Sequence, residues 1–137
     1  MKKLLVLILS FGLIYSSFAQ DDASIAINKM KLLSLNSCEN CLLKGVLLRD
    51  ENLEDANLSK ASLIGAELIG ANLRFVNFSG ADLTNAKLIA VDLSYANLTN
   101  ANLRRAYFKG AILHEATIKG AIFCKTEMPW GMDNSGC

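Results

Sequence analysis

Large hydrophobic residues recur every five positions from Cys41 to Lys125 without an insertion, in phrases such as ANLSK, ASLIG and AELIG. The large residue, which we call the centre of each repeat, is apolar in all seventeen copies, and a small residue stands two positions before it. That small residue is Ala in twelve copies, with Val46, Val76, Val91, Cys41 and Glu51 as departures. The centres are Leu43, Leu48, Leu53, Leu58, Leu63, Leu68, Leu73, Phe78, Leu83, Leu88, Leu93, Leu98, Leu103, Phe108, Leu113, Ile118 and Phe123.

This period of five excludes two regular structures. An α-helix turns about 100° per residue, so a step of five would scatter the centres around its axis. A straight strand alternates its faces, so an odd step would send successive centres to opposite sides. A chain that bends once per repeat keeps every centre inside, and Gly or Asn at many repeat ends, such as Gly65 and Asn85, tolerates tight turns. The pattern therefore predicts a coil with an apolar interior.

The recurring phrase A-[N/D]-L-x-x resembles the pentapeptide-repeat family, and the resemblance covers residues 41–125. It implies an all-β fold, a right-handed quadrilateral β-helix with four repeats in each coil. Seventeen repeats then make a solenoid of a little over four coils. At a strand spacing of about 4.8 Å, the rod is roughly 20 Å long.

The segment before the repeats predicts export. Residues 1–19 combine Lys2 and Lys3, an apolar run from Leu4 to Tyr15, and small residues for cleavage after Ala19, as in a secretory signal peptide. A membrane anchor is the alternative, but the run is shorter than the roughly 20 residues that a spanning helix needs. We therefore expect a periplasmic or secreted protein that is free of the membrane after cleavage. Loss of the two lysines changes the formal charge from +1 to −1.

Residues 20–40 lack the repeat and form the predicted N-terminal cap. Asp22 is a candidate N-cap for a helix from Ala23 to Ser34. Ala26, Met30 and Leu33 would share one face of this helix. Because the first coil of a solenoid exposes its interior, we expect this short helix to cover it.

Four cysteines lie at the two ends of the repeats: Cys38 and Cys41, spaced C-x-x-C, then Cys124 and Cys137. Four cysteines allow three pairings. The rod length that the family resemblance implies puts the ends about 20 Å apart, beyond the roughly 7 Å between Cα atoms that a disulfide spans. The pairs Cys38–Cys41 and Cys124–Cys137 remain, one at each cap. Exported family members look similar, with a T-x-M-P-x-G segment, here in the C-terminal cap 126–137, before the last cysteine.

Two other interpretations of the cysteines are thiol-redox catalysis and a zinc site. A redox C-x-x-C needs a helix N-terminus in a βαβ context, which the sequence does not predict. A four-thiolate zinc site would need both ends of the rod to converge. Glu51, at an inward position, would carry a costly buried charge unless the first coil lets it reach water, and a ligand contact is the alternative.

Residues twenty apart stack in columns on the outer faces. Asn57, Asn77, Asn97 and Thr117 form one column, in which amides would hydrogen-bond along the stack. His114 is expected on the surface beside Glu115. Exposed apolar residues that stack can form a contact surface for another protein, although packing between coils is the alternative. The candidates are two alternative surfaces, one made by Ile64, Ile69 and Ile89 and the other by Phe75 and Tyr95.

The sequence contains no catalytic constellation, so we expect neither an enzyme nor a cofactor or metal. Members of the family that mimic DNA bind type II topoisomerases, and DNA carries one negative charge per roughly 1.7 Å. Residues 41–125 hold eight acidic and ten basic residues, a net +2, which disfavours mimicry.

We therefore predict an exported scaffold or protein–protein interaction module, monomeric or weakly dimeric, with an unknown protein partner and no nucleic acid. A DNA-mimicking topoisomerase-binding protein and an envelope thiol-redox protein are the alternatives.

Overall fold

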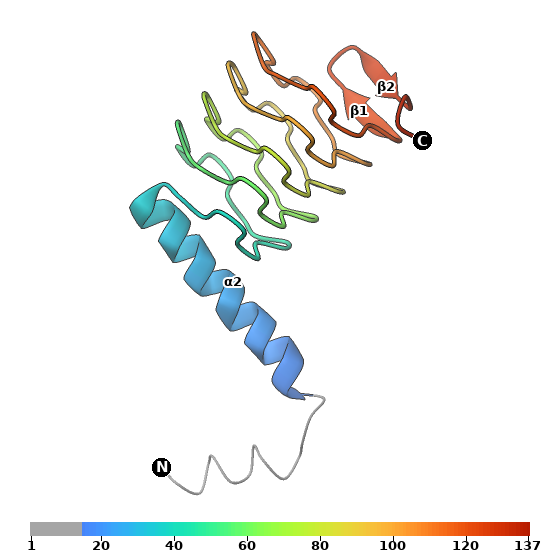
Figure 1. Ribbon diagram of the computed structural model, residues 1–137. Helices are drawn as coiled ribbons and strands as arrows, with labels where there is room; N and C mark the ends of the chain where they lie inside the picture. The colour runs from blue at the N-terminus through green and yellow to red at the C-terminus, as the bar shows by residue number, and fades with distance from the viewer. Residues whose placement is uncertain (1–14) are drawn as a thin grey trace, which may run out of the picture.

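A computed structural model describes residues 15–137. Helix α2 (Tyr15–Leu35) is followed by a stack of coils and then by a short hairpin of strands β1 (Thr126–Met128) and β2 (Gly131–Asp133). Figure 1 shows α2 at one end of the stack and the hairpin at the other. Most of the expected signal peptide, residues 1–14, lies outside the described residues.

Each coil contains four five-residue repeats. Parallel bridges join residues twenty apart, from Ser37 with Asn57 to Tyr107 with Glu127. The backbone has a positive φ at all eighteen repeat ends from Asn40 to Lys125, and these residues are the corners of the coil. A side of three residues between corners allows only one bridge, so the walls are single bridges rather than long strands. The expected four-sided coil is therefore what forms.

The interior is filled by the centres and the small residues that precede them. Leu73 and Phe78, in the middle of the stack, are fully buried, as are Ala56 and Ala86. Burying a leucine side chain contributes roughly 1.5 to 3 kcal/mol, which the entropy of ordering the chain largely offsets. Stability therefore depends on each coil being covered on both sides.

Asn or Asp before the centre stabilises the wall in two ways. The Asn77 side-chain oxygen accepts the backbone N–H of Ser79 at 3.0 Å, and the same bond recurs in other repeats. Along the stack, Asn77 donates to Asn57 and Asn97 donates to Asn77, each at 3.4 Å. The expected amide ladder is present, and a second one joins Asn72 to Asn52 at 2.9 Å.

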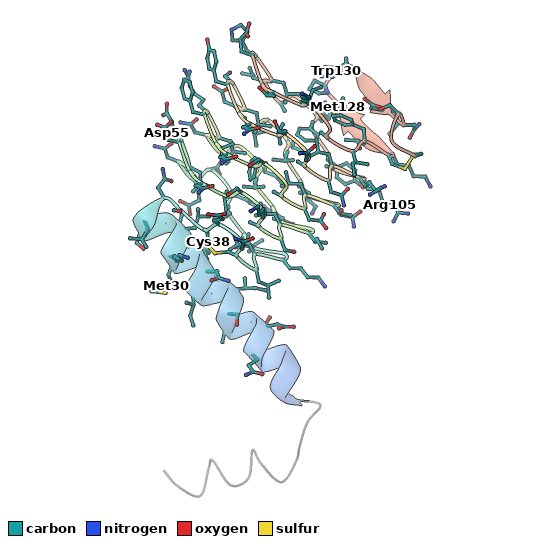
Figure 2. The ribbon with its side chains drawn as sticks, in the orientation of Figure 1. Met30, Cys38, Asp55, Arg105, Met128 and Trp130 are labelled. Carbon is teal, nitrogen blue, oxygen red and sulfur yellow. A yellow bond between two sulfur atoms is a disulfide. The ribbon has the colours of Figure 1, made fainter. Side chains whose placement is uncertain are left out.

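Helix α2 covers the first coil with a different face from the one predicted. Leu32 is fully buried and Ile25 packs against the core. Met30, by contrast, is 72% exposed and projects away from the coils (Figure 2). The expectation that Ala26, Met30 and Leu33 form the covering face was wrong, because both sides of α2 carry apolar residues and hydrophobicity alone could not choose between them.

Polar side chains of α2 form hydrogen bonds with the first coil, and these bonds favour the face that is buried. The first coil has no preceding coil to bond the carbonyls on its N-terminal side. Asn28 donates to Leu42 O at 2.9 Å, Lys29 donates to Leu47 O at 2.6 Å, and Asn36, just after the helix, donates to Glu54 O at 2.7 Å. The cap therefore supplies the hydrogen bonds that a further coil would have made.

The predicted start of the helix was also wrong. Helix α2 begins at Tyr15, so Asp22 lies inside it rather than at its N-cap. Residues 15–22 contain neither Gly nor Pro, so nothing in their sequence stops a helix that packing stabilises further along.

The C-terminal cap closes part of the other end. Glu127 of β1 bonds to the coil below it, donating to Ala106 O at 2.9 Å and accepting from Phe108 N at 2.7 Å. Met128 is buried, and Gly136 donates to Phe123 O at 2.6 Å. A Cβ on Gly136 would stand 2.6 Å from that oxygen, so only glycine fits there.

Disulfides join Cys38 to Cys41 and Cys124 to Cys137, the pairing expected from the family resemblance. Each bridge links a cap to its adjoining coil, as Figure 2 shows for Cys38 beside α2. The two bridges therefore fasten opposite ends of the stack.

The last coil departs from the predicted core. Ile118, expected inside, is 41% exposed, and Leu113 is only partly buried. The reason is that no further coil lies over residues 111–120, whereas the centres from Leu58 to Leu103 have a coil on both sides and α2 covers the first coil.

Ion pairs on the coil surface make stability depend on pH. Hydrogen bonds from Lys87, at 2.8 Å, and from Arg49 hold the pKa of Glu67 below its ordinary value of 4.5. A lowered pKa in the folded state means that this stabilisation is full above pH 4.5 and is lost as the pH falls.

We expect Glu67→Gln to weaken the decrease in stability that acid causes. Urea midpoints measured between pH 7 and pH 3 should fall less for this variant than for the wild type. Glu115→Gln, at an exposed corner, serves as the control. Equal pH dependence in the wild type and Glu67→Gln would contradict the assignment.

Candidate interaction surface

One corner of the solenoid carries two aromatic residues in succession. Asp55, Phe75, Tyr95 and Glu115, which we call the corner column, lie twenty residues apart, and each has a φ between 55° and 62°. A left-handed backbone costs roughly 1 to 2 kcal/mol for a residue other than glycine. Bulky rings at such a corner point outward, because the backbone turns inward on both sides of them.

The aromatic rings form a stack, which we call the ladder. The Phe75 and Tyr95 rings are stacked with centroids 4.9 Å apart and an interplanar angle of 6°. The His114 ring meets Tyr95 edge-on at 5.5 Å, and the Arg74 guanidinium carbon lies 5.6 Å from the Phe75 centroid. Phe75 and Tyr95 nevertheless remain 45% exposed each, so the ladder presents ring edges to solvent.

Arg74, which contacts the Phe75 ring, also lies close to two carboxylates. Arg74 lies 3.8 Å from Glu54 and 4.0 Å from Asp92. A hydrogen bond from the Ser94 hydroxyl, at 2.6 Å, is the main reason that the pKa of Asp92 is lowered, with Arg74 adding a smaller effect. Arg74 thus lies within ion-pair distance of two carboxylates, and Phe75 and Tyr95 are the exposed apolar part of this corner.

The two predicted contact surfaces differ in exposure. Phe75 and Tyr95 are adjacent and exposed. Ile69 and Ile89 belong to another column and Ile64 to the neighbouring face, and all three are half-buried, which suits packing between coils. Glu51 is half-buried as well, so its carboxylate is not sealed in the core.

Two members of the ladder were missed. His114 is exposed, as expected, but its contact with Tyr95 was not predicted. The two residues are nineteen apart, one short of a full coil, so a column of residues twenty apart does not contain both. Arg74 directly precedes Phe75, yet sequence adjacency alone does not show that its side chain turns towards the ring.

Within residues 15–137, no group of three or more His, Cys, Asp or Glu side chains is placed to hold a metal ion. In the same part of the chain, no helix combines the length and the apolar character that crossing a membrane requires.

A family model described as pentapeptide repeats (8 copies) matches residues 37–74, 52–88 and 86–123. These matches cover more than half of the chain. The chain belongs to the pentapeptide-repeat family. Family membership indicates the handedness of the four-sided coil, because the family and its solved structures imply a right-handed β-helix. No curated protein sequence matches the chain.

Solved pentapeptide-repeat structures share the coil. HetL, involved in heterocyst differentiation regulation in the cyanobacterium Nostoc sp. strain PCC 7120, is 33% identical with a TM-score of 0.58, over 69% of this chain and 52% of HetL. The alr5209 protein of Nostoc PCC 7120 is 33% identical with a TM-score of 0.54, over 68% of this chain and 74% of that protein. This chain therefore spans about half the length of HetL.

QnrB1, a plasmid-mediated fluoroquinolone resistance protein, is 20% identical with a TM-score of 0.62, over 67% of this chain and 48% of QnrB1. At this identity, the likeness concerns the fold alone.

Proposed function

We propose that this protein is an exported, disulfide-capped interaction scaffold without catalytic activity, and that it contacts a protein partner through Phe75 and Tyr95 of the corner column. The supporting observation is the exposed aromatic stack on a rigid backbone. Side chains already held in place lose little entropy on binding, and aromatic residues are enriched at the energetic centres of interfaces.

Export is supported by the cysteines and by the first residues. Disulfides persist in oxidising compartments and are rare in the cytosol. All four cysteines are paired, and residues 1–19 match the pattern of a signal peptide. We therefore place the protein in the periplasm or outside the cell.

Charge favours this proposal over DNA mimicry. Three of the eight carboxylates in residues 41–125 lie in ion pairs: Glu54 and Asp92 with Arg74, and Glu67 with Arg49 and Lys87. Cations outnumber carboxylates in the same range by ten to eight. A surface that imitates the phosphate backbone needs carboxylates that are not neutralised.

Burial disfavours a thiol-redox role for the C-x-x-C pair. Cys38 is fully buried and Cys41 nearly so, between α2 and the first coil. Thiol exchange requires an attacking thiolate to reach a sulfur atom, and this packing shields both. The bridge is therefore better suited to holding the cap.

We expect the double variant Phe75→Ala, Tyr95→Ala to lose at least tenfold in affinity for a partner captured from the cell envelope. Removal of two interface aromatics costs about 2 kcal/mol or more. Ala90 already occupies a left-handed corner, so alanine is compatible with this backbone. Affinity would be measured by surface plasmon resonance with the captured protein.

Tyr107→Ala is the matched control, since Tyr107 is a similarly exposed aromatic residue outside the corner column. It should bind as the wild type does. If the double variant retained wild-type affinity, the corner column would not be the contact surface.

A further inference from the structure

The C-terminal end of the solenoid has an unpaired backbone edge. Inside the stack, centre and corner N–H groups donate to the next coil, as Leu98 does to Thr117 O at 2.8 Å and Asn100 does to Lys119 O at 2.9 Å. Residues 111–120, which we call the open edge, have no coil after them. Among residues 15–137, no hydrogen bond is made by the N–H groups of Leu113, Glu115, Ile118 and Gly120, or by the carbonyls of Ala111 and Ala116.

Apolar side chains accompany these unpaired groups. Ile118 and Ile112 are exposed, and Leu113 is only partly buried. The N-terminal end differs, because α2 covers its core and donates hydrogen bonds to its carbonyls. An exposed edge with apolar side chains and unpaired backbone groups is a template for pairing with another strand.

The hairpin beside the open edge offers such a strand. The N–H and the carbonyl of Glu127 both form hydrogen bonds with the coil. The hydrogen bonds between β1 and β2 must therefore come from the residues on either side of Glu127. Met132, opposite Glu127, then turns its own N–H and carbonyl away from β1. Its side chain is 62% exposed, and Trp130 in the connecting turn is exposed as well (Figure 2).

We propose that the open edge is an interface with a second copy of this chain, in which β2 of each copy pairs with the open edge of the other. At the C-terminal end of the solenoid, the hairpin covers one part of the last coil and leaves the open edge uncovered, so this end has the shape of a step (Figure 1). Two such steps related by a two-fold axis fit together, because each hairpin fills the space over the other's open edge.

Both sides of this contact carry backbone groups that can form hydrogen bonds. Towards the position of a further coil, the open edge presents the four N–H groups and two carbonyls named above, and β2 brings one acceptor and one donor, the Met132 carbonyl and N–H. Met132 and Ile118 would meet and bury apolar area that is exposed in one copy. The contact involves only the end of a narrow rod, so the dimer is a weak one that exchanges with monomer. It does not use Phe75 or Tyr95, the residues of the proposed partner contact.

Sedimentation equilibrium over a range of concentrations tests the proposal, with the purified protein and both disulfides formed. The wild type should dimerise as its concentration rises. Ile118→Lys and Met132→Glu should each weaken the dimer at least tenfold. Both side chains are exposed, so the variants should retain the wild-type melting transition. Leu47→Lys, an exposed change on the first coil, is the control that should dimerise normally.

Mixing the two variants makes the test specific. A dimer of Ile118→Lys with Met132→Glu has one wild-type contact and one contact that pairs a lysine with a glutamate. The mixture should therefore recover a dissociation constant within a few-fold of that of the wild type. A wild-type protein that stays monomeric, a dimer that neither variant weakens, or a mixture that fails to recover would each overturn the proposal.

Discussion

Leu73→Asp is expected to abolish folding. Leu73 is fully buried in the middle of the stack, with a coil on either side. The change removes roughly 1.5 to 3 kcal/mol of apolar burial and adds roughly 3 to 5 kcal/mol for an unpaired buried charge. The loss is comparable to the whole stability of a small domain, about 5 to 15 kcal/mol. Circular dichroism during heating should show no cooperative transition.

Ser79→Asp is the matched control for this prediction. It places the same charge in the next repeat but at a partly exposed position on the outer wall. This variant should melt cooperatively within a few degrees of the wild type. A soluble Leu73→Asp protein with a normal melting transition would show that the centres do not form the core.

Removing the Cys124–Cys137 bridge is expected to have the second largest effect. The bridge closes a loop with a sequence separation of 13, and loops of about 15 residues gain roughly 3 kcal/mol from cross-linking in the chain-entropy model. It also ties Gly136 against Phe123, so its loss would free the cap over Phe123 and Met128. Cys124→Ala with Cys137→Ala should therefore lower the melting temperature by about 10 °C or more.

The second disulfide provides a comparison. Cys38→Ala with Cys41→Ala opens a loop with a separation of only 3, for which the same model gives a smaller loss of about 2 kcal/mol. Helix α2 keeps its own hydrogen bonds to the first coil. If this variant were the less stable of the two, loop closure would not be what the bridges contribute.

Corner residues illustrate how far the candidate site could be predicted. Phe75 and Tyr95 were expected to stack because a coil of twenty residues places them one above the other, and they do. Their contacts with His114 and Arg74 depend on side-chain rotamers, which the repeat does not specify. Ile69 and Ile89 share the same regularity, but their depth in the wall separates them from the exposed rings.

The caps show the limit of the periodic pattern. Helix α2 carries apolar residues on two faces, and the face that packs is the one whose Asn28 and Lys29 reach carbonyls of the first coil. That choice depends on atoms that are distant in the sequence. The expected signal peptide, of which residues 1–14 lie outside the described part of the chain, stays a prediction.

The four sides of the coil and the local pairing of the cysteines followed from the resemblance to the pentapeptide-repeat family. By its period alone, the sequence determined a coil with buried centres. It could do so because a period of five with apolar centres is compatible with neither a helix nor a straight strand, and because successive repeats have the same pattern of apolar and polar residues. Only the tertiary structure decided which face of α2 is buried and that the last coil leaves Ile118 exposed. These features lie where the repetition stops, and there the outcome depends on which distant groups complete the hydrogen bonds of the end coils.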